Sequence, residues 1–188
     1  MPLLAPTPDS LQVGRFILRI FTPSDWRLEQ ALSRDDDVIR WTLFPPHLSD
    51  ERAQLRMTRM EQARGECLLA RYSVREGAEI LGTAGISCSV DGVPELIYAL
   101  LPKGRGRGAA TAATRGLSDW ALASGLPTVA LRTIAGNTLS EAVAQRSGFR
   151  AVRTEQQRQH NIPVQMRYWT RTHKWGRGGT GPLQILPA

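Results

Sequence analysis

The sequence predicts one α/β (α+β) domain with a mixed, mostly antiparallel sheet of about seven strands and about four helices. Short β-branched and aromatic runs alternate with segments that carry helix N-caps and helical spacing. Three strand-like runs follow one another through tight turns, which indicates antiparallel pairing, whereas one strand–helix–strand passage over 94–134 indicates a parallel crossover. The chain has 188 residues, of which 41% are hydrophobic and 22% charged, so it can bury a core of ordinary size.

The N-terminal third is expected to hold an arm, a strand and two helices. Residues 1–10 contain three prolines and are expected to form a flexible arm. FILRIF (16–21) has the composition of a strand, and the TPS triplet at 22–24 caps a helix directly after it. Ser49, followed by acidic residues, caps a second helix. Between the two helices, residues 35–48 are expected to be irregular.

A meander of three strands follows, and the chain then alternates between helix and strand. The meander strands are CLLARYSV (67–74), EILGTAGISCSV (79–90) and PELIYALL (94–101), separated by the turn-forming stretches REGA and DGV. The later elements are a helix over 109–123, a strand over 128–134, a helix over 137–147 and strands over 149–156 and 163–171. These elements place the domain within residues 11–173 and leave a basic, Gly/Pro-rich tail at 174–188.

Charge is distributed unevenly along the chain. Residues 1–100 carry 11 Arg against 14 Asp plus Glu, a net −3, whereas residues 101–188 carry 13 Arg plus Lys against 3 acidic residues, a net +10, which together give +7. A half this basic attracts phosphorylated cofactors, nucleic acid or anionic lipid, although a solvated basic face would have the same composition.

The sequence contains no pattern typical of a metal site or a membrane protein. His47, His160 and His173 lack ligand spacing, and Cys67 and Cys88 form no metal or redox motif. No apolar run is long enough to span a membrane, and the start of the chain does not resemble a secretory signal. We therefore expect a cytoplasmic protein without a metal.

A glycine-rich, basic turn joins the third meander strand to the helix at 109–123. Gly104, Gly106 and Gly108 let the backbone wrap around a phosphate, because they lack side chains and adopt positive φ readily. The free amides at the start of the helix bind anions, and the basic residues between the glycines add charge. The turn therefore predicts a pyrophosphate cradle. It lacks the P-loop and Rossmann motifs, and an RNA-binding RGG element fits poorly between a strand and a helix.

Three motifs in order resemble the GCN5-related N-acetyltransferase (GNAT) superfamily. Arg105-Gly106-Arg107-Gly108-Ala109-Ala110 matches its [RQ]-x-x-G-x-[GA] loop. The run from Tyr98 to Trp120 is similar to the ribosomal-protein N-terminal acetyltransferase (RimJ/RimL-like) subgroup. Downstream, N-x-x-[AS]-x-x-[VL] followed by G-F is supplied by Asn137, Ser140, Val143, Gly148 and Phe149. The resemblance covers roughly residues 11–173.

The resemblance implies a GNAT fold whose sheet splays between the family's fourth and fifth strands. It also implies acetyl-CoA (acyl-CoA) as donor, and transfer by direct attack of an amine in a ternary complex. The pyrophosphate would lie on the amides of 105–110, and the pantetheine arm would pair with the strand edge at Leu100 and Leu101. The cofactor-binding residues expected on this basis are Leu100, Leu101, Lys103, Arg105, Gly106, Arg107, Gly108, Ala109, Ala110 and Asn137.

The expected catalytic residues are Glu95 and Ser140. Glu95 matches a strand glutamate of the ribosomal-type subgroup and could act as general base, or be a solvated residue after the DGVP turn. Many relatives carry a thiolate-protonating tyrosine where this chain has Ala144. Either Ser140 donates the proton, or water does, or the donor is not a thioester. Trp26, Trp41 and Phe44 could line the acceptor pocket or could simply be packing residues.

The basic C-terminal half keeps a second function open. Relatives with this fold include aminoacyl-tRNA-dependent transferases, which need a cationic track and no tyrosine acid. The track would consist of Arg153, Arg158, Arg167, Arg171, Lys174 and Arg177. A third alternative is a non-catalytic RNA- or ribosome-binding module. For the leading hypothesis the acceptor is a small-molecule or peptide amine, and the protein is expected to be a monomer or a homodimer.

Overall fold

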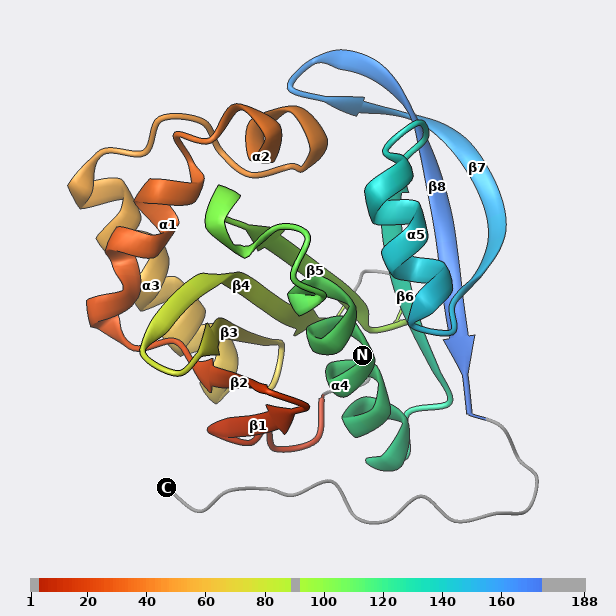
Figure 1. The fold of residues 1–188 in the computed structure, drawn as a ribbon, viewed down its shortest axis with the longest axis horizontal. Coiled ribbons are helices and arrows are strands. Elements are labelled where there is room, and N and C mark those ends of the chain that lie inside the picture. Colours follow the sequence, from red (N-terminus) through yellow and green to blue (C-terminus); the bar gives the residue numbers. More distant parts are fainter. Residues whose placement is uncertain (1–3, 89–91, 174–188) are drawn as a thin grey trace.

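In the computed structural model, residues 4–88 and 92–173 are described, and they form an eight-stranded sheet flanked by helices (Figure 1). The strands are β1 (Ser10–Val13), β2 (Phe16–Ile20), β3 (Leu69–Glu76), β4 (Glu79–Ser87), β5 (Glu95–Leu100), β6 (Thr128–Ile134), β7 (Arg150–Gln159) and β8 (Ile162–Thr172). The helices are α1 (Trp26–Leu32), α2 (Asp36–Trp41), α3 (Asp50–Gly65), α4 (Ala109–Ala123) and α5 (Thr138–Arg146), with short 3-10 turns at Pro23–Asp25 and Pro102–Gly104. The tail 174–188, with Lys174 and Arg177, lies outside the described residues.

The sheet has the order β1-β2-β3-β4-β5-β6-β8-β7, and β5–β6 is its one parallel pair within the described residues. These two strands are paired only at Glu95↔Ala130 and Leu96↔Leu131. The later part of β5 therefore has an unpaired edge toward β6, whereas its other edge pairs with β4 up to Leu100. The mixed sheet and its splay between the family's fourth and fifth strands, here β5 and β6, confirm the predicted fold class.

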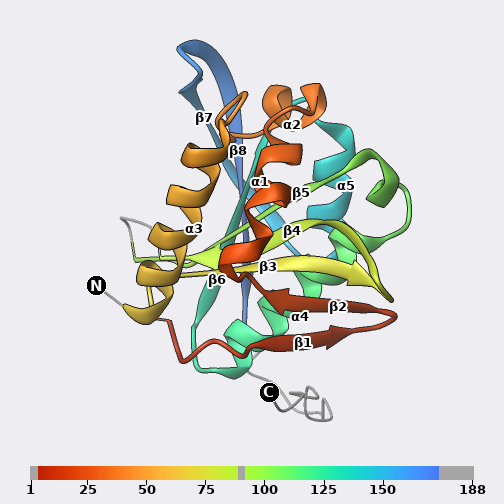
Figure 2. The same cartoon turned by 90° about the vertical axis from the view of Figure 1, so that its left-hand side faces the viewer.

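Two helical layers cover the two faces of the sheet. Helices α1, α2 and α3 lie on one side, visible in front of the sheet in Figure 2, and bury Leu28, Leu32 and Ala53 in a core that includes Ala99 of β5. Helix α4 packs on the other face together with Leu96. Because successive strand residues point to opposite faces, β5 contributes side chains to both layers.

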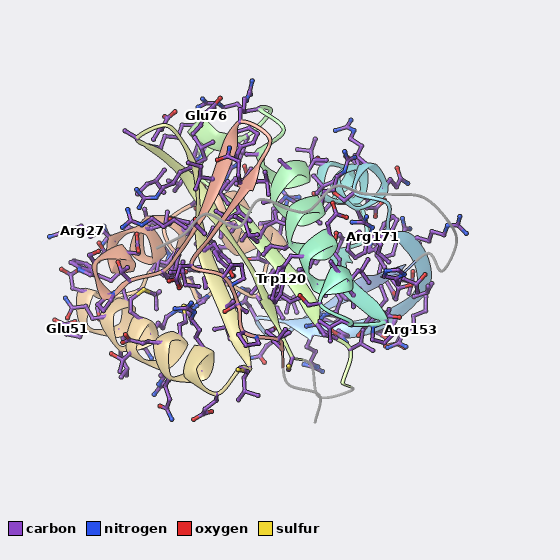
Figure 3. All side chains as sticks on the ribbon, turned by 90° about the horizontal axis from the view of Figure 1, so that it is seen from below. Arg27, Glu51, Glu76, Trp120, Arg153 and Arg171 are labelled. Atoms are coloured by element: carbon purple, nitrogen blue, oxygen red, sulfur yellow. The ribbon has the colours of Figure 1, made fainter. Side chains whose placement is uncertain are left out.

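Helix α4 sits unusually close to the N-terminal hairpin. A Cβ added at Gly116 would lie 2.1 Å from Val13 Cγ1, so only a glycine allows this approach. Trp120, at the centre of Figure 3, is also buried on this helix. The layer under the glycine-rich loop is therefore tightly packed.

The N-terminal part of the structure differs from the sequence expectations in three places. The sequence reading missed β1, which pairs with β2 through a turn at Gly14, and it treated α2 as irregular although Asp35 Oδ1 caps it by accepting a bond from the Val38 amide at 2.9 Å. In place of a loose arm, Leu4 is buried and its amide bonds Cys67 O at 2.9 Å. Both missed elements are short, so their stability comes from packing on the rest of the fold.

The last two strands are longer than predicted. The strands β7 and β8 form a hairpin joined by His160 and Asn161, whose positive φ values of 47° and 67° suit a tight two-residue turn. In Figure 1 this hairpin arches toward α2. There the side-chain amide of Gln159, which is buried, donates to Ile39 O at 3.1 Å and Arg40 O at 3.0 Å and lies 2.5 Å from Thr42 O. The hairpin tip thus holds the C-terminal end of α2 and the residue that follows it.

Candidate active site

The glycine-rich loop presents a row of free backbone amides. Gly106 and Gly108 have φ values of 72° and 83°, and Gly108 is the N-cap of α4 without any side-chain cap. Within the part of the chain that is described, the amides of residues 106–111 have no hydrogen-bond partner, while the Ala112 amide is the first to bond back, to Gly108 O at 3.0 Å. Free amides at a helix start fit the oxygens of a diphosphate.

The basic side chains of the loop are held by carboxylates. Arg105 donates to Asp37 at 2.8 Å and to Asp35 at 2.5 Å, both at the start of α2. Arg107 bonds Glu79 at 2.7 Å and also Glu76, at the end of the β3–β4 hairpin. These side chains therefore hold the loop in place. The groups left free to donate hydrogen bonds are the backbone amides.

One backbone expectation does not fit the structure. The amide of Leu101 donates to Leu81 O at 2.9 Å, and its carbonyl accepts from the Gly104 amide at 2.8 Å. Leu101 is therefore engaged inside the protein, and the open edge of β5 lies before it. Gly104 explains the local geometry, since a Cβ there would lie 2.4 Å from Leu81 O.

A cavity of about 280 Å³ passes through the gap between β5 and β6. Its lining comes from the end of α2 and the segment after it, and from α3, β3, β5, β6, the start of α5 and β8. Glu95 and Ile97 belong to one face of β5, and Leu96 and Tyr98 to the other, yet all four line it. The cavity is therefore lined by residues from both faces of the sheet.

Glu95 and Arg132 form an ion pair in this cavity. Arg132 Nε donates to Glu95 Oε1 at 2.6 Å, and the Glu95 side chain is only 12% exposed. Burial opposes the charge of Arg132, but the hydrogen bond and charge of Glu95 outweigh it and raise the pKa of Arg132. The predicted solvated alternative for Glu95 does not hold, because its carboxylate is mostly buried at the cavity wall.

Tyr98 and Ser140 meet on the opposite side of the gap. Burial raises the pKa of Tyr98 to about 12, with the nearby Ser140 hydroxyl acting in the opposite direction. Among the described residues the buried Tyr98 hydroxyl has no partner in good hydrogen-bond geometry. Asn137 Oδ1 accepts from the Ser140 amide at 3.1 Å, which confirms Asn137 as the cap of α5. Ala144 is fully buried in the core beside α4.

The predicted aromatic pocket is partly present. Trp41 and Phe44 line the cavity, whereas Trp26 packs against the core of α1–α3 and lines no part of it. Sequence reasoning gave no role to Tyr98 and did not single out Arg56, Arg71 or Arg132, which also line the cavity. The sequence did hold a signal for Tyr98, because this residue begins the run to Trp120 that is similar to the ribosomal-protein acetyltransferase subgroup.

The proposed nucleic-acid residues are largely paired with acids. Arg153 lies 2.8 Å from Glu155, Arg167 bonds Glu141 at 2.8 Å, and Arg171 bonds Asp119 at 2.5 Å. Arg153 and Arg171 come from the β7–β8 side of the molecule, far from Glu76 on the β3–β4 hairpin (Figure 3). The described residues show no group of three side chains suited to a metal ion, and none of the described helices is long and apolar enough to cross a bilayer.

Together, an open strand edge, a helix start with free amides and a cavity between two strands fit a group-transfer site for a phosphorylated donor. The acetyltransferase (GNAT) domain family matches residues 15–150, so the chain belongs to this family. It is therefore an acyl-CoA-dependent N-acetyltransferase, as the sequence resemblance predicted.

Solved structures of low sequence identity share the fold. A RimL ribosomal L7/L12 α-N-protein acetyltransferase in complex with coenzyme A matches with a TM-score of 0.74 and 15% identity, over 87% of this chain and 97% of its own. The microcin C7 self-immunity acetyltransferase MccE, with acetyl-CoA and AMP, gives 0.79 and 15% over 89% and 98%. An enzyme from Salmonella typhimurium that modifies the N-terminal serine of ribosomal protein L7/L12 gives 0.76 and 14% over 88% and 99%. No curated protein matches this chain.

Proposed function

We propose that this protein acetylates a primary amine that enters the cavity from the α2–α3 side, with Glu95 as proton acceptor and Tyr98, beside Ser140, as proton donor. The observation that carries the proposal is the through-sheet cavity, which brings these groups together from both faces of the sheet. Acetyl-CoA, when bound, supplies an acyl group that is already activated as a thioester, so the protein has to position groups and move protons.

The loop and the edge of β5 fit the donor. The unpartnered amides of residues 106–111 would hold its diphosphate, and the open edge of β5 before Leu101 would hold its arm by strand-like hydrogen bonds. Arg105 and Arg107 would keep the loop in place through their carboxylate partners.

Glu95 is suited to accept the proton that the amine loses. Its pairing with Arg132 fixes the position of its carboxylate at the cavity wall. On the other side, the Tyr98 hydroxyl keeps its proton at neutral pH, because burial raises its pKa to about 12. With acetyl-CoA bound, this protonated hydroxyl would supply the proton that a leaving thiolate needs, which would compensate for Ala144.

The cavity also limits the acceptor. About 280 Å³ is at the small end for ligand pockets, so it accommodates a small amine or the first residue of a peptide. Structures with this fold include enzymes named for the N-terminus of a ribosomal protein, which supports a protein amine as the acceptor.

Two measurements test the proposal. Acetyl-CoA should raise the melting temperature of the protein, and no rise at millimolar acetyl-CoA would contradict donor binding. Glu95→Gln should lower kcat/KM by about 100-fold while the thermal shift with acetyl-CoA persists. The matched control is Glu155→Gln on β7, whose carboxylate also pairs with an arginine but lies on the surface. Equal rates for the two variants would remove Glu95 as the base.

A further inference from the structure

A buried cluster of charged side chains beside the cavity has no role in the proton transfers proposed above. Glu29 of α1 is fully buried, and its Oε2 accepts from Arg56 Nε at 3.0 Å and lies 2.9 Å from Arg56 Nη2. Arg56 comes from α3 and also stacks on Phe44, 5.2 Å from the ring centre. The charge of Glu29 therefore has its partner in Arg56.

Arg71 of β3 is a second guanidinium next to this pair, and it has no such partner. It is 9% exposed, it lines the cavity, and its buried Nε makes no hydrogen bond. Within the described part of the chain, no hydrogen bond or ion pair to its side chain is found, although the charge of Glu29 acts on it from nearby. Burial, which disfavours its charge, lowers the pKa of Arg71.

The structure makes room for this arginine. A Cβ at Gly85, its neighbour on β4, would lie 3.1 Å from Arg71 Cδ and 2.6 Å from Ala70 O. Of the other charged side chains that line the cavity, Glu95 and Arg132 neutralise each other. Glu29 likewise neutralises Arg56. On the α1–α3 side of the cavity, the positive charge of Arg71 is therefore left without a partner among the described residues.

An unpaired buried guanidinium is costly, and an anion in the cavity would remove that cost. The planar guanidinium fits carboxylate and phosphate groups, which accept two parallel hydrogen bonds from it. Arg71 lies on the α1–α3 side, from which the acceptor enters, and away from the loop that would hold the diphosphate of the donor.

We propose that Arg71, supported by Arg56, binds an anionic group of the acceptor, so that the substrate is a primary amine that also carries a carboxylate or a phosphate. The inference rests on the proposed acetyl transfer for the identity of the acceptor, and it adds the substrate class. The competing explanation is that Arg71 only balances the charge of Glu29.

The test uses acceptors in pairs that differ only in the anionic group. Suitable pairs are amino acids with their amides, dipeptides with Asp or Asn in second position, and phosphoethanolamine with ethanolamine. Thiol release from acetyl-CoA gives the rates, and calorimetric titration without donor gives the affinities. At least one anionic member should exceed its neutral partner by about 10-fold or more in kcat/KM. The carboxylate and phosphate pairs separate the two sources of the anion.

Variants then test whether Arg71 causes the preference for the anionic acceptor. Arg71→Met should remove it, mainly through a higher KM for the anionic member, and should weaken binding of that member in calorimetry. Arg71→Lys should retain part of it and serves if the methionine variant does not fold. Arg59→Met is the matched control, because Arg59 is an exposed arginine on the same helix as Arg56. It should leave the preference unchanged.

Two results would overturn the inference. One is a wild-type enzyme that treats the members of every pair alike, and the other is an Arg71→Met or Arg71→Lys variant that keeps the full preference. A wild-type protein that binds anionic amines but shows no thermal shift with acetyl-CoA would count against the acetyl transfer and not against the role of Arg71.

Discussion

The donor side and the acceptor side of this site are built in different ways. The donor side is one continuous stretch, from the edge of β5 through the glycine-rich loop into α4, and its free donors are backbone amides. The acceptor side combines side chains from α3, β3, β6, the segment after α2 and the tip of the β7–β8 hairpin. The position of the free amides therefore depends on the local conformation of one segment. The position of the cavity side chains depends on contacts between segments that are distant in the sequence.

The largest expected effect tests the backbone side of this comparison. Gly108→Val places a β-branched residue at φ 83°, which such residues avoid, and should misdirect the amides that follow. We expect acetyl-CoA affinity, measured by calorimetry, to fall by about 100-fold, the equivalent of about two lost charge-assisted hydrogen bonds.

Gly125→Val is the matched control for this variant. Gly125 follows α4 with φ 94° and has equally open surroundings, so it carries similar strain far from the loop. It should lose stability but keep donor affinity. If both variants lose affinity equally, general destabilisation explains the effect and the loop has no special role.

Tyr98→Phe tests the point where the two sides meet. It removes only the buried hydroxyl, so kcat should fall by about 10- to 100-fold with little change in either KM. Tyr72→Phe removes another buried hydroxyl, which bonds Pro8 O at 3.0 Å away from the cavity, and should leave kcat unchanged. A normal rate in Tyr98→Phe together with a slow Ser140→Ala variant would move the proton donor to Ser140.

Gln159→Ala tests how the acceptor side is held together. Loss of its bonds to the carbonyls of Ile39 and Arg40 should free the end of α2, raising the acceptor KM by about 3- to 10-fold, since each lost bond is worth about 1 kcal/mol. The donor KM should not change, because the loop is bonded to the start of α2 through Asp35 and Asp37 and not to the carbonyls that Gln159 holds. Gln156→Ala, an exposed neighbour on β7, should behave as wild type. A change in donor KM alone would contradict the division into two sides.

The smallest effect is a loss of stability at alkaline pH. Burial raises the pKa of both Tyr72 and Tyr98 to about 12, above the value near 10 of the unfolded chain. The unfolded state therefore loses these protons first, so the stabilisation is complete below pH 10 and declines as the pH rises toward 12. Denaturant titrations of Tyr98→Phe should show a shallower decline over this range than wild type does. An identical decline would show that Tyr98 titrates normally.

The sequence predicted the elements that depend on local signals. Ser49 caps a helix as expected, and the glycine turn falls between β5 and α4. The sequence did not predict α2, which is six residues long and is anchored by the bonds from Arg105 to Asp35 and Asp37. It also did not predict that Arg105 and Arg107 would be neutralised, because their carboxylate partners lie about 30 to 70 positions away in the chain.

By itself, the sequence determined the family, most of the element order and the glycine-rich turn with its free amides, since glycine positions, caps and motif spacing act over a few neighbouring residues. Only the tertiary structure decided that Glu95 pairs with Arg132, that Tyr98 meets Ser140, and that Arg71 lies buried without a partner. The reason is physical: burial and ion pairing depend on which distant segments pack together, and no local pattern encodes that.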